Sequence, residues 1–234
     1  MGATANRDEA AITGARAGAT LEETAVTTGG RPAPKGRRLY RTLSLALRWL
    51  RWWARLEVRG LEALPRSGPV LVVCNHDSWL EPLALAEAMM WGDRYARFLA
   101  KASLWKSRPL AAILDGLAQI PIRRGEGDTG ALEAAVAALG RGEAVAIFPE
   151  GTYSRGQELR ARTGVARLAR ACPEVPVVLA AIEGGTVLTR FRGRPQVKVE
   201  FFTPAGGKAG GEEPLGELAQ RWLDEIRARV PPTT

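Results

Sequence analysis

An α/β fold with a mostly parallel central sheet flanked by helices is predicted by two features of the sequence. Short apolar runs rich in Val, Leu and Ile recur along the chain, which is typical of strands buried on both faces. Segments with the periodicity of amphipathic helices lie between these runs, and strands that alternate with helices usually pair in parallel. The sequence also predicts an N-terminal amphipathic helix at a membrane interface, placed before this sheet.

Length, charge and metal-binding residues limit the class of protein. The 234 residues suffice for one domain with a hydrophobic core. There are 33 Lys and Arg against 25 Asp and Glu, a net charge of +8, which favours an anionic partner such as nucleic acid, acidic lipid or a phosphorylated substrate. Cys74 and Cys172 give no CxxC pair and no disulfide framework. The single histidine, His76, excludes a multi-histidine zinc site, so no metal is expected.

The N-terminal part of the chain differs from the rest in composition. Residues 1–34 are rich in Gly, Thr and Ala and are predicted to form a mobile tail. Residues 35–58 are predicted to form an amphipathic helix with two segregated faces. One face is polar and mostly basic, formed by Arg41, Ser44, Arg48, Arg51 and Arg55. The other face is apolar, formed by Leu45, Trp49, Trp52, Trp53 and Leu56.

This helix has three interpretations. It can lie in a bilayer interface, with Trp at headgroup depth and Arg reaching lipid phosphates, which is the favoured one. Alternatively, the Trp face packs on the domain core. A nucleic-acid groove is disfavoured because basic and aromatic residues would then share a face. The sequence has no run of about 18 apolar residues, the length that would predict a transmembrane helix. We therefore expect a peripheral or monotopic protein on the cytoplasmic face of the cell membrane.

Residues 59–230 are predicted to form the globular domain. Apolar runs of Val, Ile, Leu and Phe predict strands at residues 69–74, 95–100, 120–122, 144–148, 175–182 and 197–202. Apolar residues three and four apart predict helices at residues 83–91, 109–117, 129–139, 164–171 and 215–230. Gly140 follows the Ala-rich third helix, at the position where a glycine commonly ends a helix.

His76 is the first candidate for catalysis. It follows the predicted strand 69–74, at the strand end where α/β sheets bind ligands. A neutral imidazole can take a proton from an alcohol when a carboxylate fixes its tautomer. Glu81, five residues on, can fold back to the ring if a turn and a first helical turn intervene, and Asp77 is the adjacent alternative. A lone histidine is more often structural, so this segment alone does not identify an enzyme.

Two further predicted strands end in polar residues. Residues 147–155, IFPEGTYSR, offer a carboxylate, hydroxyls, backbone N–H groups and an arginine, which together can hold a phosphorylated headgroup. Strand 120–122 is followed by Arg123 and Arg124, and paired arginines clamp phosphate through forked hydrogen bonds. The alternatives are a plain strand-to-loop turn and a solvated arginine pair.

The order of these segments resembles a known family. His76 with Glu81, then residues 120–124 (IPIRR), 148–152 (FPEGT) and 175–178 (VPVV), follow one another along the chain. They resemble the four ordered sequence blocks of the glycerolipid acyltransferases, specifically the 1-acylglycerol-3-phosphate acyltransferase family. The resemblance covers roughly residues 55–205 and identifies residues 59–230 as an acyltransferase domain.

The resemblance implies an activity. The expected reaction moves a fatty acyl group from acyl-CoA or acyl-carrier protein to the free hydroxyl of 1-acylglycerol-3-phosphate and gives phosphatidic acid. No cofactor and no metal are expected. The expected partners are a membrane surface with anionic lipids, a lysophospholipid and the acyl thioester, with acyl-carrier protein as an alternative donor and no nucleic acid.

The resemblance also implies roles for single residues. His76 is expected to be the catalytic base and Glu81 its partner. Lys101, in a segment that resembles a stretch between the first two blocks, is a candidate for an oxyanion or substrate contact. The acceptor and its phosphate are expected at Arg123, Arg124, Glu150, Gly151 and Thr152.

Three positions depart from the family pattern. Glu81 stands where Asp is usual, which adds one methylene, and Leu179 replaces a common Pro. Tyr153 stands where the lysophosphatidate enzymes usually carry Arg, which removes a positive charge beside the acceptor. Another lysolipid, an aminolipid or a glycolipid is therefore an alternative acceptor, and a non-catalytic lipid-binding relative is an alternative function. Ser78 as a nucleophile is disfavoured because it does not lie in a GxSxG turn.

Overall fold

The computed structural model describes residues 39–40, 42, 45, 52–123, 128–155, 157–185, 193–207 and 213–230. The strands are β1 (Leu56–Arg59), β2 (Val70–Cys74), β3 (Ala96–Lys101), β4 (Ile120–Ile122), β5 (Ala144–Ile147), β6 (Val177–Glu183) and β7 (Val197–Phe202). The α-helices are α2 (Glu81–Trp91), α3 (Arg108–Gly116), α4 (Thr129–Gly140), α5 (Gly164–Ala171) and α7 (Leu215–Arg227). Two short 3-10 helices, η1 (Leu61–Ala63) and η2 (Ala102–Lys106), were not predicted.

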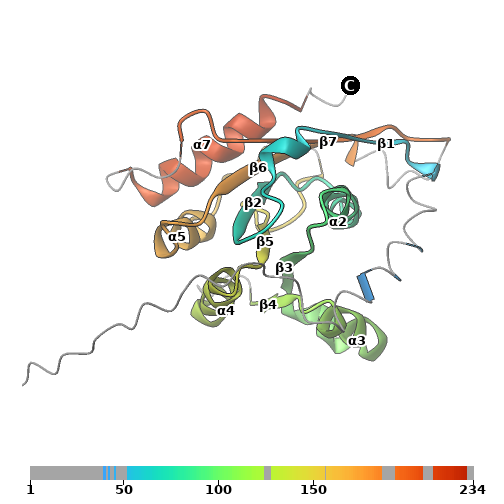
Figure 1. Ribbon diagram of the computed structural model, residues 1–234, viewed down its shortest axis with the longest axis horizontal. Coiled ribbons are helices and arrows are strands. Elements are labelled where there is room, and N and C mark those ends of the chain that lie inside the picture. The colour runs from blue at the N-terminus through green and yellow to red at the C-terminus, as the bar shows by residue number, and fades with distance from the viewer. Residues whose placement is uncertain are drawn as a thin grey trace, which may run out of the picture.

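The strands form one seven-stranded sheet in the order β1-β7-β6-β2-β5-β3-β4 (Figure 1). Strands β6, β2, β5, β3 and β4 run parallel to one another. Strand β7 runs antiparallel to β6, and β1 runs parallel to β7. The predicted mostly parallel sheet is therefore confirmed, and the strands and helices predicted within residues 59–230 agree with the structure except at their ends.

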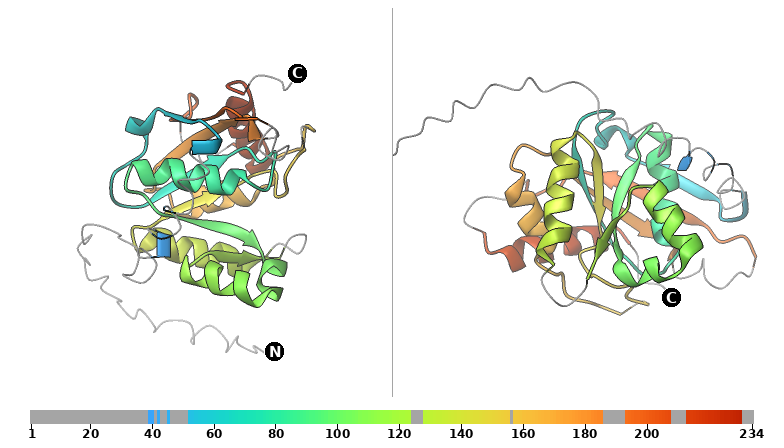
Figure 2. Two further views of the ribbon diagram at one scale, coloured as in Figure 1. Left: turned by 90° about the vertical axis from the view of Figure 1, so that its right-hand side faces the viewer. Right: turned by 90° about the horizontal axis from the view of Figure 1, so that it is seen from below.

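Helices cover both faces of the sheet because strand residues alternate between them. Val72 and Cys74 of β2 belong to a core cluster with α2, whereas Leu71 and Val73 belong to a cluster with α4, α5 and α7. Figures 1 and 2 show α2 on one side of the sheet and α4, α5 and α7 on the other. This double coverage explains why β2, β5 and β6 are apolar along almost their whole length.

The central position of β2 brings distant segments together. Strand β2 lies between β5 and β6, with Val73 opposite Ile147 and Cys74 opposite Ala180. The connection after β2 leads past β5 to β3, and the connection after β5 crosses to β6, so the chain changes direction here. Such a switch point is where open α/β sheets bind ligands. Residues that follow β2, β5 and β6 therefore lie side by side at the edge of the sheet formed by the C-terminal ends of these parallel strands.

The predicted interfacial helix is wrong at its C-terminal end. Residues 56–58 belong to strand β1, which pairs with β7, instead of continuing a helix. Leu56 and Val58 pack against the core cluster two residues apart, as a strand requires. The apolar spacing from Trp52 to Leu56 also fits a helix, so periodicity alone could not separate the two structures.

Most of the helix and the predicted tail lie outside the described residues. Of the predicted helix, Leu39, Tyr40, Thr42, Leu45, Trp52 and Trp53 are described as helical. Trp53 packs against the core, whereas 67% of Trp52 is exposed, with the Arg194 guanidinium 5.1 Å from its ring centroid. The two tryptophans thus have different environments. No helix in the described part of the chain has the length and apolar character needed to cross a bilayer.

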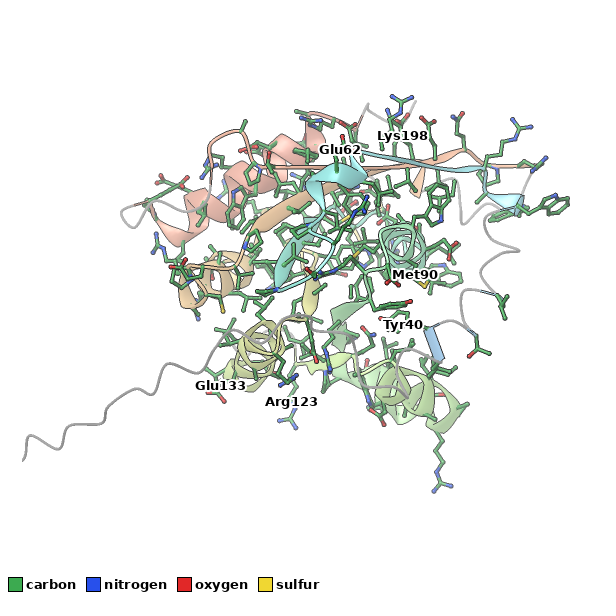
Figure 3. The ribbon with its side chains drawn as sticks, viewed as in Figure 1. Tyr40, Glu62, Met90, Arg123, Glu133 and Lys198 are labelled. Carbon is green, nitrogen blue, oxygen red and sulfur yellow. The ribbon has the colours of Figure 1, made fainter. Side chains whose placement is uncertain are left out.

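Tyr40 fixes the N-terminal segment to the domain. Its side chain is buried, and Figure 3 places it beside β3. The hydroxyl donates to the carbonyl oxygen of Ala96 and accepts a hydrogen bond from Nε2 of Gln119 at 2.9 Å. The ring contacts Tyr95 edge to face, with 5.3 Å between centroids. Gln119 in turn accepts from the N–H of Phe98, so Tyr40 extends a buried polar network at the start of β3.

Replacing Tyr40 by Phe should therefore destabilise the fold. The variant keeps the ring but leaves buried polar groups of Ala96 and Gln119 with fewer partners, so the free energy of unfolding should fall by about 1–3 kcal/mol. Urea denaturation followed by circular dichroism measures this. Tyr95→Phe is the matched control, because its hydroxyl bonds to the exposed Asp93, and we expect a change below about 0.5 kcal/mol. Equal losses in both variants would contradict the assignment.

Candidate active site

The loop after β2 is fixed by Asn75. Its side-chain Nδ2 donates to the carbonyl oxygen of Ile182 at 2.9 Å, and its Oδ1 accepts from the N–H of Ile182 at 2.8 Å. The amide thus pairs with β6 as a backbone peptide group would. This side-chain clamp holds the chain immediately before His76.

His76 and Glu81 make the contact that the sequence predicts. Nδ1 of His76 lies 3.3 Å from Oε2 of Glu81, and both residues are buried. Oε2 also accepts hydrogen bonds from the backbone N–H groups of Asp77 and Ser78. Helix α2 begins at Glu81 itself, so its first turn brings the carboxylate back beneath the loop.

Asp77, the alternative partner, has a different place. Its carboxylate accepts hydrogen bonds from Oγ of Ser154 and from Nδ2 of Asn75, the latter at 3.3 Å. Glu81, with its longer side chain, is the carboxylate in contact with the imidazole. The structure thus favours Glu81 as the partner of His76.

The surroundings of Glu81 oppose its ionisation. Burial raises the pKa of Glu81 well above its ordinary value, and the neighbouring charge of Asp77 raises it further, while the N–H groups of Ser78 and Asp77 lower it. A positive charge next to Oε2 would offset this penalty. The site is therefore suited to stabilise His76 when the imidazole accepts a proton.

Gly185, which the sequence analysis missed, makes room for Glu81. A Cβ atom on Gly185 would lie 1.7 Å from Oε1 of Glu81, so a larger side chain cannot occupy this position without displacing the carboxylate. Oε1 is buried and has no hydrogen-bond partner among the described residues. The glycine pair after β6 is visible in the sequence, but its relation to Glu81 depends on the order of β2 and β6.

Aromatic rings orient the imidazole. The ring of Phe148 stacks on His76 with 4.3 Å between centroids and 25° between planes. Tyr153 meets the imidazole edge to face at 6.1 Å, and Phe98 stacks behind Phe148 at 6.1 Å. These contacts hold the imidazole against the segment that follows β5.

The segment after β5 is joined to the His76 loop by its backbone. The N–H of Ser154 donates to the carbonyl oxygen of His76 at 2.6 Å, and the N–H of Arg155 donates to that of Asp77 at 3.2 Å. Oε2 of Glu150 accepts from the N–H of His76 at 2.9 Å. Glu150, a predicted acceptor-binding residue, is buried and engaged with this backbone, which favours a positioning role.

Arg227 is a second residue that the sequence analysis missed. It lies in α7, outside the segments that carry the family resemblance. Its Nη2 donates to Oε1 of Glu150 at 3.0 Å and to the carbonyl oxygen of Leu159 at 2.7 Å. No local pattern in the sequence indicates this pair, because the two residues are distant along the chain.

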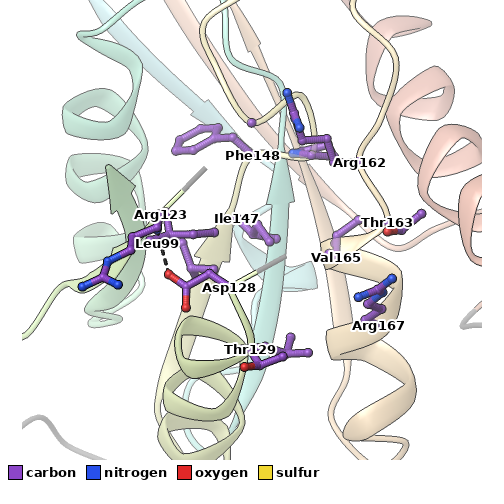
Figure 4. A pocket seen from close by; sticks show the side chains of 15 residues that line it. Leu99, Arg123, Asp128, Thr129, Ile147, Phe148, Arg162, Thr163, Val165 and Arg167 are labelled. Atoms are coloured by element: carbon purple, nitrogen blue, oxygen red, sulfur yellow. Dashed lines mark hydrogen bonds between the residues drawn. The ribbon is translucent and has the colours of Figure 1, made fainter. Parts of the chain in front are cut away.

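A cavity of about 280 Å³ opens beside Phe148, between the first turns of α4 and α5 (Figure 4). Of the predicted site residues, Arg123 and Gly151 line it, and Gly151 carries a positive φ of 70°. Arg124 lies outside the described residues. The apolar lining residues are Leu99, Ile122, Leu132, Ile147, Phe148, Pro149 and Val165.

The remaining predicted residues that the structure describes do not line this cavity. His76 is not among the lining residues, but the ring of Phe148 both lines the cavity and stacks on the imidazole. Thr152 is half-buried next to Gly151. Lys101 is exposed at the end of β3, the strand that lies between β5 and β4. The structure thus brings His76, Glu81 and residues 148–154 into contact. Lys101 lies at the C-terminal end of a neighbouring parallel strand, and no hydrogen bond or ion pair joins it to these residues in the described structure.

Comparisons with known proteins agree on one family, the acyltransferases. A family model described as Acyltransferase matches residues 55–183, more than half of the 234 residues. The chain is 36% identical over 168 residues to the lyso-ornithine lipid O-acyltransferase of Pseudomonas aeruginosa, covering 68% of this chain and 60% of that protein. It is 32% identical over 192 residues to the 1-acyl-sn-glycerol-3-phosphate acyltransferase alpha of Homo sapiens, covering 79% of this chain and 66% of that protein. The match thus spans less than two thirds of either relative.

A solved structure has a similar fold. The crystal structure of the 1-acyl-sn-glycerophosphate (LPA) acyltransferase PlsC from Thermotoga maritima superposes with a TM-score of 0.63 over 82% of this chain and 77% of that chain. The sequence identity is 22%, so this likeness concerns the fold.

Glu150 should give stability a measurable pH dependence. Burial raises the pKa of Glu150 from 4.5 to about 7, although Arg227 lowers it. Between these values the folded state holds a proton that the unfolded chain releases, so the stability that this group contributes at low pH is lost as the pH rises. Relative to a Glu150→Gln variant, the free energy of unfolding of the native chain should fall by about 1–3 kcal/mol from about pH 4.5 to about pH 8.

Urea denaturation of both proteins across this pH range measures the difference. Taking the difference between native chain and variant cancels the other titrating groups. If the two stability profiles run parallel, Glu150 is not protonated in the folded state near neutral pH.

Proposed function

The chain belongs to the acyltransferase family, and on this basis we propose that it transfers a fatty acyl group from a thioester donor to the free hydroxyl of a lysophospholipid. The favoured acceptor is 1-acylglycerol-3-phosphate, whose acylation gives phosphatidic acid in phospholipid biosynthesis. The observation that carries the proposal is the buried contact of 3.3 Å between His76 and Glu81 beside the segment after β5. A cavity with basic residues next to this pair supports an anionic acceptor.

The proposed mechanism uses His76 as a general base. The contact between Nδ1 and Oε2 of Glu81 favours the tautomer with its proton on Nδ1, which leaves the lone pair of Nε2 to accept the proton of the acceptor hydroxyl. The alkoxide oxygen attacks the thioester carbonyl and forms a tetrahedral oxyanion. When the oxyanion collapses, the C–S bond breaks and the imidazolium returns its proton to the leaving thiolate. No acyl-enzyme is formed.

Glu81 stabilises the charged form of the base in this mechanism. The imidazolium that forms during proton transfer places a positive charge beside a carboxylate whose ionisation is opposed by burial. The interaction is therefore stronger in the transition state than in the resting enzyme, which is what lowers the barrier. Backbone N–H groups or Lys101 would stabilise the oxyanion, and either acyl-CoA or acyl-carrier protein would serve as the donor.

An aminolipid is a second candidate acceptor. Tyr153 removes the positive charge expected at this position, and its hydroxyl accepts from Nη2 of Arg155 at 3.2 Å. The relative from Pseudomonas aeruginosa is named for a lyso-ornithine lipid. Ornithine carries a carboxylate and an amine in place of a phosphate. Binding of such a headgroup would therefore depend less on a cation at position 153.

The edge that carries His76 also has features of a membrane-binding surface. Trp79, Leu104 and Tyr153 are exposed, and each follows the C-terminal end of a parallel strand. Lys101, the last residue of β3, and Arg155, in the segment after β5, are exposed and supply positive charge. Aromatic and basic residues of this kind interact with the headgroups of anionic lipids. We therefore propose peripheral association with the cytoplasmic face of the cell membrane.

Replacing His76 by Ala should lower acyl transfer by a factor of about 10² to 10⁴. Release of free thiol from acyl-CoA in the presence of 1-acylglycerol-3-phosphate measures turnover, and mass spectrometry identifies the product. Ser78→Ala is the control, because the Ser78 hydroxyl is buried and has no partner among the described residues. Near-full activity of the His76 variant, or complete loss with Ser78→Ala, would exclude the mechanism.

Replacing Trp79 by Ala should weaken binding to vesicles that contain anionic phospholipid by about tenfold, because an exposed tryptophan no longer enters the interface. Vesicle sedimentation measures this. Trp91→Ala is the matched control. Trp91 is also exposed, but it is the last residue of α2, at the opposite end of the helix from Glu81. Equal effects of both substitutions would place the membrane-binding surface elsewhere.

A further inference from the structure

The cavity beside Phe148 has an excess of positive charge. Its charged lining residues are Arg123, Arg162, Arg167 and Asp128. Figure 4 shows Arg123 and Asp128 on the β4 side and Arg162 and Arg167 on the α5 side, with the Arg123 guanidinium directed away from the other two. Arg162 and Arg167 were not predicted as site residues, and neither belongs to the segments that carry the family resemblance.

These two arginines are not neutralised within the described structure. Neither is in an ion pair with a described carboxylate. Asp128 is engaged elsewhere, because its carboxylate accepts from the N–H groups of Arg123 at 2.7 Å and Ala131 at 3.1 Å as the cap of α4. Helix α5 begins at the cavity without a side-chain cap, so its N-terminal dipole adds to the positive potential.

Arg162 is held against the segment that contacts His76. Its N–H donates to the carbonyl oxygen of Pro149 at 2.8 Å. Its side chain crosses Gly151, where a Cβ atom would lie 2.7 Å from both Cδ and Nε of Arg162. The positive φ of Gly151 and this close approach both require glycine. Arg162 therefore supplies a positive charge beside the segment after β5, in which position 153 carries the neutral Tyr153.

The cavity adjoins the site of the proposed reaction through Phe148. Phe148 lines it on one side and stacks on the imidazole of His76 at 4.3 Å. A headgroup in the cavity is thus separated from His76 by one aromatic side chain. Side chains of β4, β5 and α4 supply apolar walls, and Arg162 and Arg167 are both exposed residues at this cavity, so an anion from solvent can reach them.

We propose that this cavity is an oxyanion-binding site in which Arg162 and Arg167 bind the charged headgroup of the acyl acceptor. The proposal rests on the proposed function, and it assigns acceptor recognition to two residues beyond Arg123, Arg124 and residues 150–152. The bound group is a phosphate or a carboxylate, since a guanidinium forms forked hydrogen bonds with either. The phosphate would come from 1-acylglycerol-3-phosphate and the carboxylate from an amino-acid lipid.

Equilibrium binding without an acyl donor tests this site independently of turnover. Isothermal titration calorimetry on the full chain would compare three soluble ligands: 1-hexanoylglycerol-3-phosphate, a short-chain N-acyl-ornithine and the neutral 1-hexanoylglycerol. Arg162→Gln and Arg167→Gln should each weaken binding of an oxyanion ligand by about tenfold or more and leave the neutral ligand unaffected. Arg160→Gln is the matched control, because Arg160 is exposed like Arg162 and Arg167 and lies in the same segment, but it does not line the cavity.

The outcomes separate the site from the reaction. A loss of affinity in the Arg162 and Arg167 variants for the phosphate ligand, the ornithine ligand or both supports the site. A loss for one ligand alone identifies the headgroup, and a loss for both shows that the site accepts either oxyanion. Unchanged affinities, equal losses with the neutral ligand, or an equal loss in the Arg160 variant would overturn it, provided that thermal melting shows intact folds. If binding depends on Arg162 but wild-type protein transfers no acyl group, the site stands and the proposed function fails. If transfer occurs and both variants bind and react as wild type, the function stands and the site fails.

Discussion

One oxygen atom of Glu81 organises the site. Oε2 contacts Nδ1 of His76 and accepts from the N–H groups of Asp77 and Ser78, so the loop after β2 folds around the first residue of α2. Burying a carboxylate is costly unless its hydrogen bonds are satisfied, and these donors offset part of that cost. The folded loop then presents its carbonyl groups to Ser154 and Arg155. The stacking of His76 on Phe148 depends on the same loop geometry.

Charge is distributed unevenly around the imidazole. Asp77, Glu81 and Glu150 lie close to it, and burial together with the charge of Asp77 raises the pKa of Glu81 and of Glu150. Arg162 and Arg167 line the cavity beside Phe148. A negative charge on these acidic residues would stabilise the imidazolium that forms during proton transfer, and the arginines favour an anionic ligand.

Local sequence patterns predicted the features that depend on neighbouring residues. The apolar strands and the contact between His76 and Glu81, which spans one loop and one helical turn, are of this kind. The clamp between Asn75 and Ile182 and the pair of Arg227 with Glu150 could not be predicted, because they depend on which strands and helices become neighbours. Strand β1 was mistaken for helix because its partner, β7, lies at the other end of the domain sequence.

The space around Glu81 links two positions that are remote in the sequence. The extra methylene of Glu81, compared with the Asp that is usual in the family, extends its carboxylate into the volume that a side chain at position 185 would fill. An aspartate at position 81 would withdraw from that volume and leave a void beside Gly185, whereas alanine at position 185 would suit only the shorter acid. Residues 81 and 185 therefore act as one unit of packing, and a lineage that changes the length of the acid must adjust the residue opposite it.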